Sequence, residues 1–168
     1  MDLAEGYMAL PTNLAVFPLH GIIDGKCACG MSVCARVGKH PACLWSEYGP
    51  GRQETGGAGV GVRTGPEFGV FVVETDQKPG VDGARNLDAL GELPPTYTVL
   101  TPSGSVHRYF RWPKGVDHLK TSGNELSPGV DVRGNGGYVV GEGSPHRLGG
   151  TYEALDGTSF DDPVSYTH

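Results

Sequence analysis

The chain has 168 residues and a formal net charge of −6, from 13 basic and 19 acidic residues. This length suits one domain with a single core and leaves no room for a second full domain. The acidic balance argues against a nucleic-acid partner, which usually binds a basic surface. Glycine and proline are frequent, at 28 and 13 residues, but 38% of the chain is hydrophobic and no repeat is present. We therefore expect a globular domain rich in strands and turns, not a linker.

The predicted elements are mostly strands. A short helix is predicted over residues 2–9, and a second helix begins at the N-cap Asp82 and ends before Pro94. Runs of apolar and β-branched residues predict strands over residues 13–17, 59–65, 69–76, 97–100, 105–112 and 138–140. The first strand should stop at Pro18, and the strand over 69–76 should be central and covered on both faces, because its apolar run is continuous. The order predicts an α/β fold with more strand than helix and a mixed sheet.

The domain should comprise residues 1–150, with a loop over residues 24–43 inserted in it. Residues 151–168 are acidic and contain no Lys or Arg, so we expect a solvated end or the start of a linker. The first five residues lack the basic and apolar stretches of a signal peptide, and no apolar run approaches the roughly 18 residues of a transmembrane helix. A cytoplasmic protein without a membrane partner is therefore expected.

All the cysteines of the chain fall in the loop over residues 24–43. Cys27, Cys29, Cys34 and His40 supply three thiolates and one imidazole, the ligand set of a closed, structural zinc site. Cys43 can replace His40 or one of the thiols, because the first spacing is C-x-C rather than the stronger C-x-x-C. Ordinary free thiols and disulfides are the alternatives, and a reducing compartment disfavours the disulfides.

Two acidic residues end the predicted central strand. Glu74 and Asp76 are separated by one residue, so their side chains face the same side of the strand. Two like charges side by side are costly unless a divalent cation lies between them, and Mg²⁺ or Mn²⁺ is held in this way beside substrate phosphates. The alternative is a strand end that carries two acidic residues with no catalytic role.

Two further pairs repeat this spacing. Ser105 and His107 place a hydroxyl and an imidazole on one face of a strand, where they can contact a phosphate. Asp131 and Arg133 add a third carboxylate and a cation that can pair with a triphosphate. Alone, the first pair is usually structural and the second is usually a surface ion pair. The chain has no Gly-x-Ser-x-Gly elbow, which weakens the case for a hydrolase triad.

Taken in order, these motifs resemble the bifunctional DNA primase/polymerase (Prim-Pol) domain of the archaeo-eukaryotic primase (AEP) superfamily. The resemblance runs from about Val16 to about Tyr152. It rests on the cysteines, residues 38–41, Trp45, residues 61–65, the strand that ends at residues 74–76, and residues 103–110 and 129–140. It implies a two-lobed α/β fold with an RRM-like mixed β-sheet at its catalytic core, and template-directed nucleotidyl transfer from NTPs or dNTPs.

The resemblance also implies roles for single residues. Those roles are metal-binding acids at Glu74, Asp76 and Asp131 for two Mg²⁺ or Mn²⁺ ions, nucleotide contacts at Ser105 and His107, and triphosphate contacts at Arg63 and Arg133. One departure is Glu74, where the family usually has Asp, and its longer arm can change metal preference or lower activity. Domains of this kind often precede a helicase in plasmid and phage replication proteins, so single-stranded DNA and a helicase domain are the expected partners, in the cytoplasm of a bacterial host.

Two other functions stay open at this point. Glu74 alone favours a catalytically weakened domain that only binds single-stranded DNA. A metal-dependent phosphohydrolase or nuclease can use the same carboxylates, but the Ser-x-His and Asp-x-Arg pairs favour a bound triphosphate. The acidic charge does not exclude DNA, because the four acids after Gly150 and the three proposed metal ligands leave 12 acidic against 13 basic residues. We expect weak, salt-sensitive template binding with few phosphate contacts.

Overall fold

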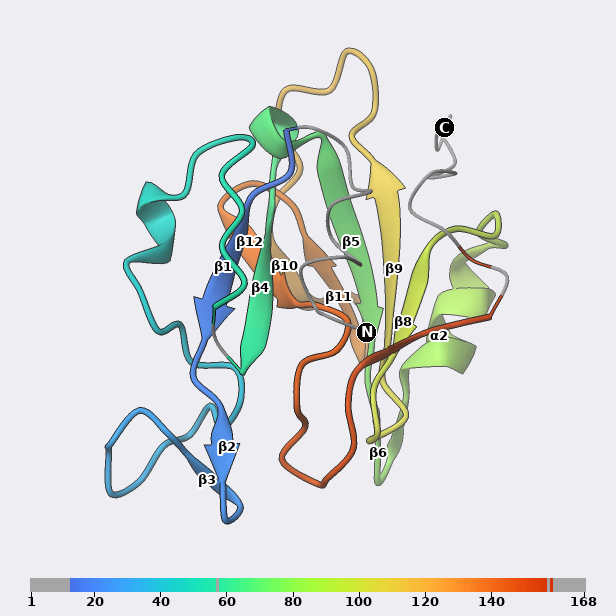
Figure 1. The fold of residues 1–168 in the computed structure, drawn as a ribbon. Coiled ribbons are helices and arrows are strands. Elements are labelled where there is room, and N and C mark those ends of the chain that lie inside the picture. Colours follow the sequence, from blue (N-terminus) through green and yellow to red (C-terminus); the bar gives the residue numbers. More distant parts are fainter. Residues whose placement is uncertain (1–12, 57, 157, 159–168) are drawn as a thin grey trace.

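Two principal sheets and one α-helix make up the described part of the computed structural model, which covers residues 13–56, 58–156 and 158 (Figure 1). The small sheet has the order β1 (Val16–Leu19), β4 (Gly59–Thr64), β12 (Gly137–Val140). The six-stranded large sheet has the order β10 (Ser122–Ser127), β11 (Val130–Arg133), β5 (Val70–Thr75), β9 (Val106–Arg111), β8 (Thr98–Leu100), β13 (Glu153–Ala154). The remaining elements are the hairpins β2–β3 (Ile22–Ile23, Lys26–Cys27) and β6–β7 (Gln77–Lys78, Val81–Asp82), the 3-10 helices η1 (Trp45–Glu47) and η2 (Pro66–Phe68), and helix α2 (Gly83–Leu90).

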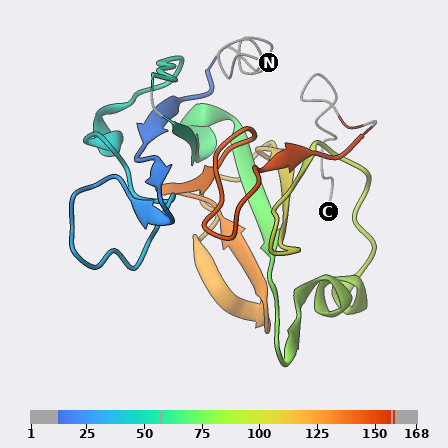
Figure 2. The ribbon, with the colours of Figure 1, turned by 60° about the horizontal axis from the view of Figure 1, so that its bottom comes forward.

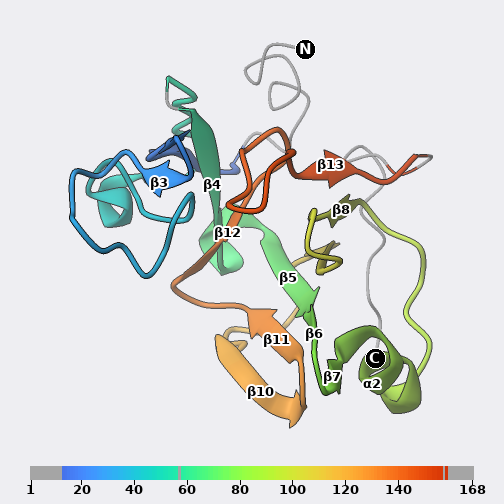
Figure 3. The same cartoon turned by 90° about the horizontal axis from the view of Figure 1, so that it is seen from below.

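The large sheet is covered on both faces, with α2 on one side and the small sheet on the other (Figure 3). Along β5, Phe71 and Val73 pack in the cluster that includes Leu87 of α2. Val70 and Val72 face the opposite way and join the main core between the two sheets. This alternation follows from the pleat of a strand, and it confirms that β5 is an inner strand covered on both faces.

The expectation of a mixed sheet is wrong, because every strand pairing in both described sheets is antiparallel. Helix α2 connects β5 to β8, and these two strands run in the same direction because each pairs antiparallel with β9. Since β9 is inserted between them, the crossover does not produce a parallel ladder. The arrangement is a split β-α-β unit, in which helical connections and an antiparallel sheet coexist.

The predicted strands correspond to β1, β4, β5, β8, β9 and β12. Five of them differ by at most one residue at each end, whereas β1 begins three residues later and ends two residues later than predicted. Pro18 does not stop the first strand but lies within β1, opposite Val60 of β4. Among the described residues, the other edge of β1 makes only isolated bridges, to Gln53 and Pro41, so this end strand of the small sheet tolerates a residue without an N–H. The predicted cap of α2 is confirmed, since Asp82 Oδ1 accepts a hydrogen bond from the backbone N–H of Arg85 at 3.1 Å. The helix ends at Leu90, before Gly91, and therefore stops earlier than the predicted end at Pro94 requires. The predicted helix over residues 2–9 lies outside the described residues.

In the part of the chain that the structure describes, no helix has the length and apolar character needed to cross a membrane.

Candidate active site and metal centre

Glu74 lies where the core between the two sheets ends. On β5 it follows Val70 and Val72 on the face directed at the small sheet. Its register neighbours are Asp131 on β11 and His107 on β9. Directly opposed residues on one face of a sheet are within contact range, at about 5 Å between Cβ atoms. The three side chains therefore form a row across the large sheet, although they are far apart in the sequence.

A cavity of about 290 Å³ lies beside this row, between the two sheets. Its lining from the large sheet and the adjoining turns includes six residues that the sequence singled out, Glu74, Asp76, Ser105, His107, Asp131 and Arg133. The opposite wall comes from Tyr138 and Val140 of β12, and another part comes from His146 and Tyr152. The fold thus brings the three acids, the Ser-x-His pair and Arg133 to one cavity.

Arg133 compensates two of the three carboxylates. Its Nε donates to Glu74 Oε2 at 2.8 Å, and its Nη2 donates to Asp131 Oδ2 at 3.3 Å. Burial lowers the pKa of Arg133, but the charges of Glu74 and Asp131 outweigh burial and raise the pKa. Glu74 and Asp131 are only 14% and 19% exposed at their side chains, so an uncompensated charge there would be costly.

Asp76 sits at the more open end of the cavity, with a side chain that is 47% exposed. Its Oδ1 accepts a hydrogen bond from Ser105 Oγ at 3.2 Å, and its Oδ2 lies 3.8 Å from Lys78 Nζ. Its backbone is fixed on both sides, because its N–H donates to the carbonyl of Gly129 and its carbonyl accepts from the N–H of Gly83. Ser105 therefore orients a carboxylate in this structure.

His107 is buried beneath the cavity. Its Nε2 lies 3.5 Å from Glu74 Oε1, and its ring packs against Tyr152 at 5.8 Å between centroids. Burial lowers the pKa of His107 and outweighs the opposite effect of the Glu74 charge. The imidazole is therefore neutral at neutral pH and can donate one hydrogen bond from a fixed position.

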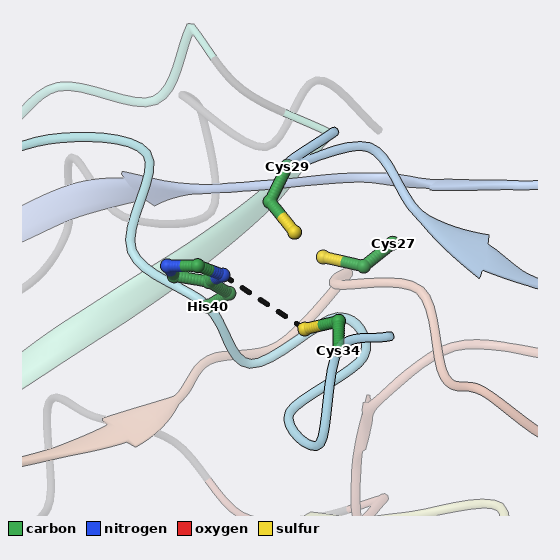
Figure 4. Close-up of side chains that lie close together, drawn as sticks. All are labelled: Cys27, Cys29, Cys34 and His40. Carbon is green, nitrogen blue, oxygen red and sulfur yellow. Dashed lines mark hydrogen bonds between the residues drawn. The ribbon is translucent and has the colours of Figure 1, made fainter. Parts of the chain in front are cut away.

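The metal-ligand cluster predicted in the loop over residues 24–43 is present in the fold (Figure 4). The ligand atoms of Cys27, Cys29, Cys34 and His40 all lie within 4.8 Å of one another, and Cys34 Sγ is 3.8 Å from His40 Nδ1. Tetrahedral zinc, with Zn–S of about 2.3 Å and Zn–N of about 2.0 Å, spaces its ligands by roughly 3.5–3.8 Å. The four side chains therefore fit a zinc ion, and we call them the Cys3His cluster.

Cys43 is not part of the Cys3His cluster. Its Sγ lies 3.9 Å from the carbonyl oxygen of Pro18, and burial raises the pKa of its thiol. The four cysteines are free thiols, so the structure contains neither the disulfides nor the exchange of Cys43 for another ligand that the sequence left open.

The loop of the Cys3His cluster also reaches the cavity. Arg36 and Lys39, between the ligands Cys34 and His40, line it together with Glu74. Figure 2 shows this loop in blue, beside the small sheet. No role was predicted for Arg36 and Lys39, although both lie between two predicted ligands and Lys39 lies in the motif over residues 38–41.

Arg63, predicted to contact the triphosphate, is not in the cavity lining. Its Nη1 donates to the carbonyls of Ser46 and Tyr48 at 3.1 and 2.8 Å, and its guanidinium lies over the rings of Phe68 and Trp45. These contacts hold the turn around Trp45, a residue that does line the cavity. Arg63 thus supports the wall and does not face the carboxylates.

Within the described residues, the Cys3His cluster is the one group of three or more potential metal-ligating side chains whose ligand atoms converge. Glu74 and Asp131 converge instead on Arg133. The cavity and the Cys3His cluster are therefore different kinds of site. In the cavity, carboxylate oxygens surround the guanidinium of Arg133, whereas the Cys3His cluster offers thiolate sulfurs and an imidazole nitrogen.

Comparison with known families identifies the domain. The model of a family described as "Bifunctional DNA primase/polymerase, N-terminal" matches residues 6–166. The chain belongs to this Prim-Pol family. The resemblance drawn from the sequence is confirmed, and the match covers nearly the whole chain. A search of curated proteins finds no match.

Membership of the Prim-Pol family implies a nucleotidyltransferase of the primase/polymerase type, with DNA and nucleotides as its substrates. A nucleotidyltransferase of this type would use divalent metals. The described fold, mostly strands with one helix, is consistent with such a domain.

Proposed function

We propose that this chain synthesises primers on single-stranded DNA by two-metal nucleotidyl transfer from NTPs or dNTPs. The observation that carries the proposal is the row of Asp131, Glu74 and His107 across the large sheet, with Asp76 on the wall of the same cavity. At about 290 Å³ the cavity is close to the lower end, about 300 Å³, of the range for small-molecule sites.

The three carboxylates suit the divalent cations of this chemistry, because Mg²⁺ and Mn²⁺ prefer oxygen ligands. We infer that Glu74, Asp76 and Asp131 hold them. When bound, two such cations lower the pKa of the attacking 3′-hydroxyl and neutralise charge on the triphosphate. Arg133 orients Glu74 and Asp131 through its hydrogen bonds to both carboxylates, and its guanidinium also suits phosphate oxygens.

His107 and Ser105 act by position. His107 is neutral and lies against Glu74. Its imidazole can therefore form a hydrogen bond with a nucleotide without adding a charge to the cavity. Ser105 orients Asp76 through the hydrogen bond to Oδ1. Replacing His107 by Ala should therefore raise the apparent KM for the nucleotide more than it lowers kcat.

The Cys3His cluster would hold zinc as a structural site, because four protein ligands leave no coordination position for water. The two principal sheets would form the two lobes of the catalytic unit, with the cavity between them. Metal analysis of the purified chain should find about one zinc per chain.

The test is de novo synthesis on homopolymer and mixed single-stranded templates, with each nucleotide class and with Mg²⁺ or Mn²⁺. Asp76→Asn and Asp131→Asn should abolish synthesis while the circular dichroism spectrum stays that of the wild type. Asp117→Asn, an exposed acid outside the cavity lining, is the matched control and should leave synthesis unchanged. Near wild-type synthesis by Asp131→Asn would refute the assignment, and loss of the template strand without extension would indicate a nuclease.

A second candidate is a catalytically weakened domain that binds single-stranded DNA. The pairing of Arg133 with both Glu74 and Asp131 favours it, because this cation competes with a divalent ion for the same oxygens. Template binding without synthesis at any Mn²⁺ concentration would select this function over the first.

A further inference from the structure

One short loop belongs to both the Cys3His cluster and the cavity. Five residues lie between the ligands Cys34 and His40. Two of them, Arg36 and Lys39, line the cavity that contains the catalytic carboxylates. The conformation that brings Cys34 and His40 together is therefore the one that directs two cations at the active site.

Several contacts seat this loop on the small sheet. The Tyr138 hydroxyl accepts from Arg36 Nη2 at 2.8 Å and donates to the carbonyl of Lys39 at 2.9 Å. The N–H of Lys39 donates to the carbonyl of Arg36 at 2.8 Å, which closes a turn. Gly38 is buried at φ +73°, and a Cβ there would lie 3.2 Å from the carbonyl oxygen of Pro145. The loop is thus packed tightly against its neighbours at Gly38.

The charges of the cavity are arranged in two groups. The carboxylates come from the large sheet, and Arg133 is engaged with two of them. Arg36 and Lys39 come from the other side, and neither forms an ion pair with any residue that the structure describes. The hydrogen bond of Arg36 goes to the neutral hydroxyl of Tyr138. Arg36 and Lys39 thus have no carboxylate partner and line a cavity, so they can bind an anionic ligand there.

We propose that Arg36 and Lys39 form a subsite for the polyphosphate of a nucleoside triphosphate, and that metal at the Cys3His cluster controls its affinity. The assignment to a nucleotide rests on the proposed function. The guanidinium of Arg36 offers a planar fork to phosphate oxygens, and the ammonium of Lys39 offers a compact charge. Metal closes the loop over residues 34–40 and so removes much of the entropy cost of aligning both side chains.

The first experiment is a calorimetric titration of the full chain, loaded with zinc, with inorganic tripolyphosphate. Lys39→Ala should raise Kd by about tenfold, and the double variant Arg36→Ala/Lys39→Ala should raise it further. Lys26→Ala is the matched control, because Lys26 is an exposed cation of β3, next to the ligand Cys27, and does not line the cavity. Equal Kd values for the double variant and for Lys26→Ala would overturn the proposal.

The second experiment tests the role of metal. Chain stripped of zinc, with the loss verified by metal analysis, should bind tripolyphosphate about as weakly as the double variant. His40→Ala should do the same, with its fold checked by circular dichroism. Unchanged affinity of the stripped wild-type chain would overturn control by metal, and this measurement does not depend on whether the variant folds.

The outcomes separate this inference from the proposed function. If the chain makes no primers but tripolyphosphate binding depends on Arg36, Lys39 and zinc, the subsite stands and the proposed function fails. If the chain makes primers and the double variant binds tripolyphosphate like the wild type, the proposed function stands and the subsite fails.

Discussion

At the residue scale, Arg133 is the cation that compensates two half-buried carboxylates, Glu74 and Asp131. Arg133→Ala leaves both acids without that partner, and we expect the free energy of unfolding to fall by roughly 1–3 kcal/mol. If the acids hold divalent cations, Mn²⁺ should raise the melting temperature of Arg133→Ala more than that of the wild type.

Thermal unfolding with and without Mn²⁺ measures both effects. Arg111→Ala removes an exposed arginine of β9 and serves as the control. Equal stability of the two variants would show that Arg133 is not a structural partner of the acids.

His146 makes the stability depend on pH. It is buried, and the backbone N–H of Leu148 donates to its Nδ1 at 3.1 Å, which requires an unprotonated nitrogen. Burial lowers the pKa of His146, and the charges of Lys39 and Arg147 lower it further. The unfolded chain, with a histidine pKa of about 6.5, therefore takes up a proton that the folded chain does not. The contribution of His146 to stability is complete above about pH 6.5 and is lost as the pH falls below that value.

Urea unfolding at several pH values between 5 and 8 tests this effect. His146→Asn keeps an acceptor near the position of Nδ1 but cannot titrate, so its loss of stability on acidification should be smaller than that of the wild type. His118→Asn, which changes an exposed histidine, should follow the wild type. Parallel profiles for the wild type and His146→Asn would contradict the prediction. Because the two chains differ only at residue 146, the titration of other groups affects both profiles equally.

At the element scale, local sequence patterns predict two kinds of element. In one kind, buried and exposed residues alternate, and in the other, buried residues follow one another without interruption. The apolar run of β5 and the cap of α2 at Asp82 are of this kind. The strand β10 was missed because it is a polar edge strand with little buried surface. The strand β11 was missed because it has only four residues, and its pairing with β10 and β5 joins segments that the local sequence does not connect. The sequence singled out Glu74, Asp131 and His107 but not their arrangement in a row, because the register of these residues depends on strands distant in the sequence.

The start of α2 depends on a close approach that only glycine allows. A Cβ at Gly83 would lie 2.2 Å from the carbonyl oxygen of Gly129 and 2.7 Å from that of Asp76. Helix propensity alone predicts that Gly83→Ala stabilises the chain by about 1 kcal/mol. We expect the opposite sign, a loss of roughly 1–3 kcal/mol, because backbone atoms must move.

Chemical denaturation measures the sign directly. Gly49→Ala is the control, since nothing lies within 4 Å of a Cβ there. Primer synthesis should fall as well in Gly83→Ala, because the displaced carbonyl belongs to Asp76. A stabilised Gly83→Ala chain would show that α2 can shift without cost.

For the whole molecule, function depends on where the charges lie more than on their sum of −6. The acids Glu74, Asp76 and Asp131 lie on the large sheet and at its end, and Arg36 and Lys39 reach the same cavity from the loop of the Cys3His cluster. Net charge and composition contain no information on this separation. It arises because residues 34–40 fold onto the small sheet, and the sequence alone does not predict that packing.

The same separation predicts a shallow dependence of template binding on salt. For single strands, the slope of log Kobs against log salt is about −0.7 for each phosphate that is neutralised. Arg133 is engaged with Glu74 and Asp131, and Arg36 and Lys39 are proposed to bind the nucleotide. We therefore expect about three phosphate contacts with the template and a slope near −2. Anisotropy of a labelled single strand between 50 and 300 mM KCl measures the slope, and a value steeper than about −4 would require a basic template surface elsewhere on the molecule. The double variant Glu153→Gln/Asp156→Asn neutralises two exposed acids and so weakens only their long-range repulsion of the template. It should strengthen template binding at low salt and leave the number of phosphate contacts unchanged.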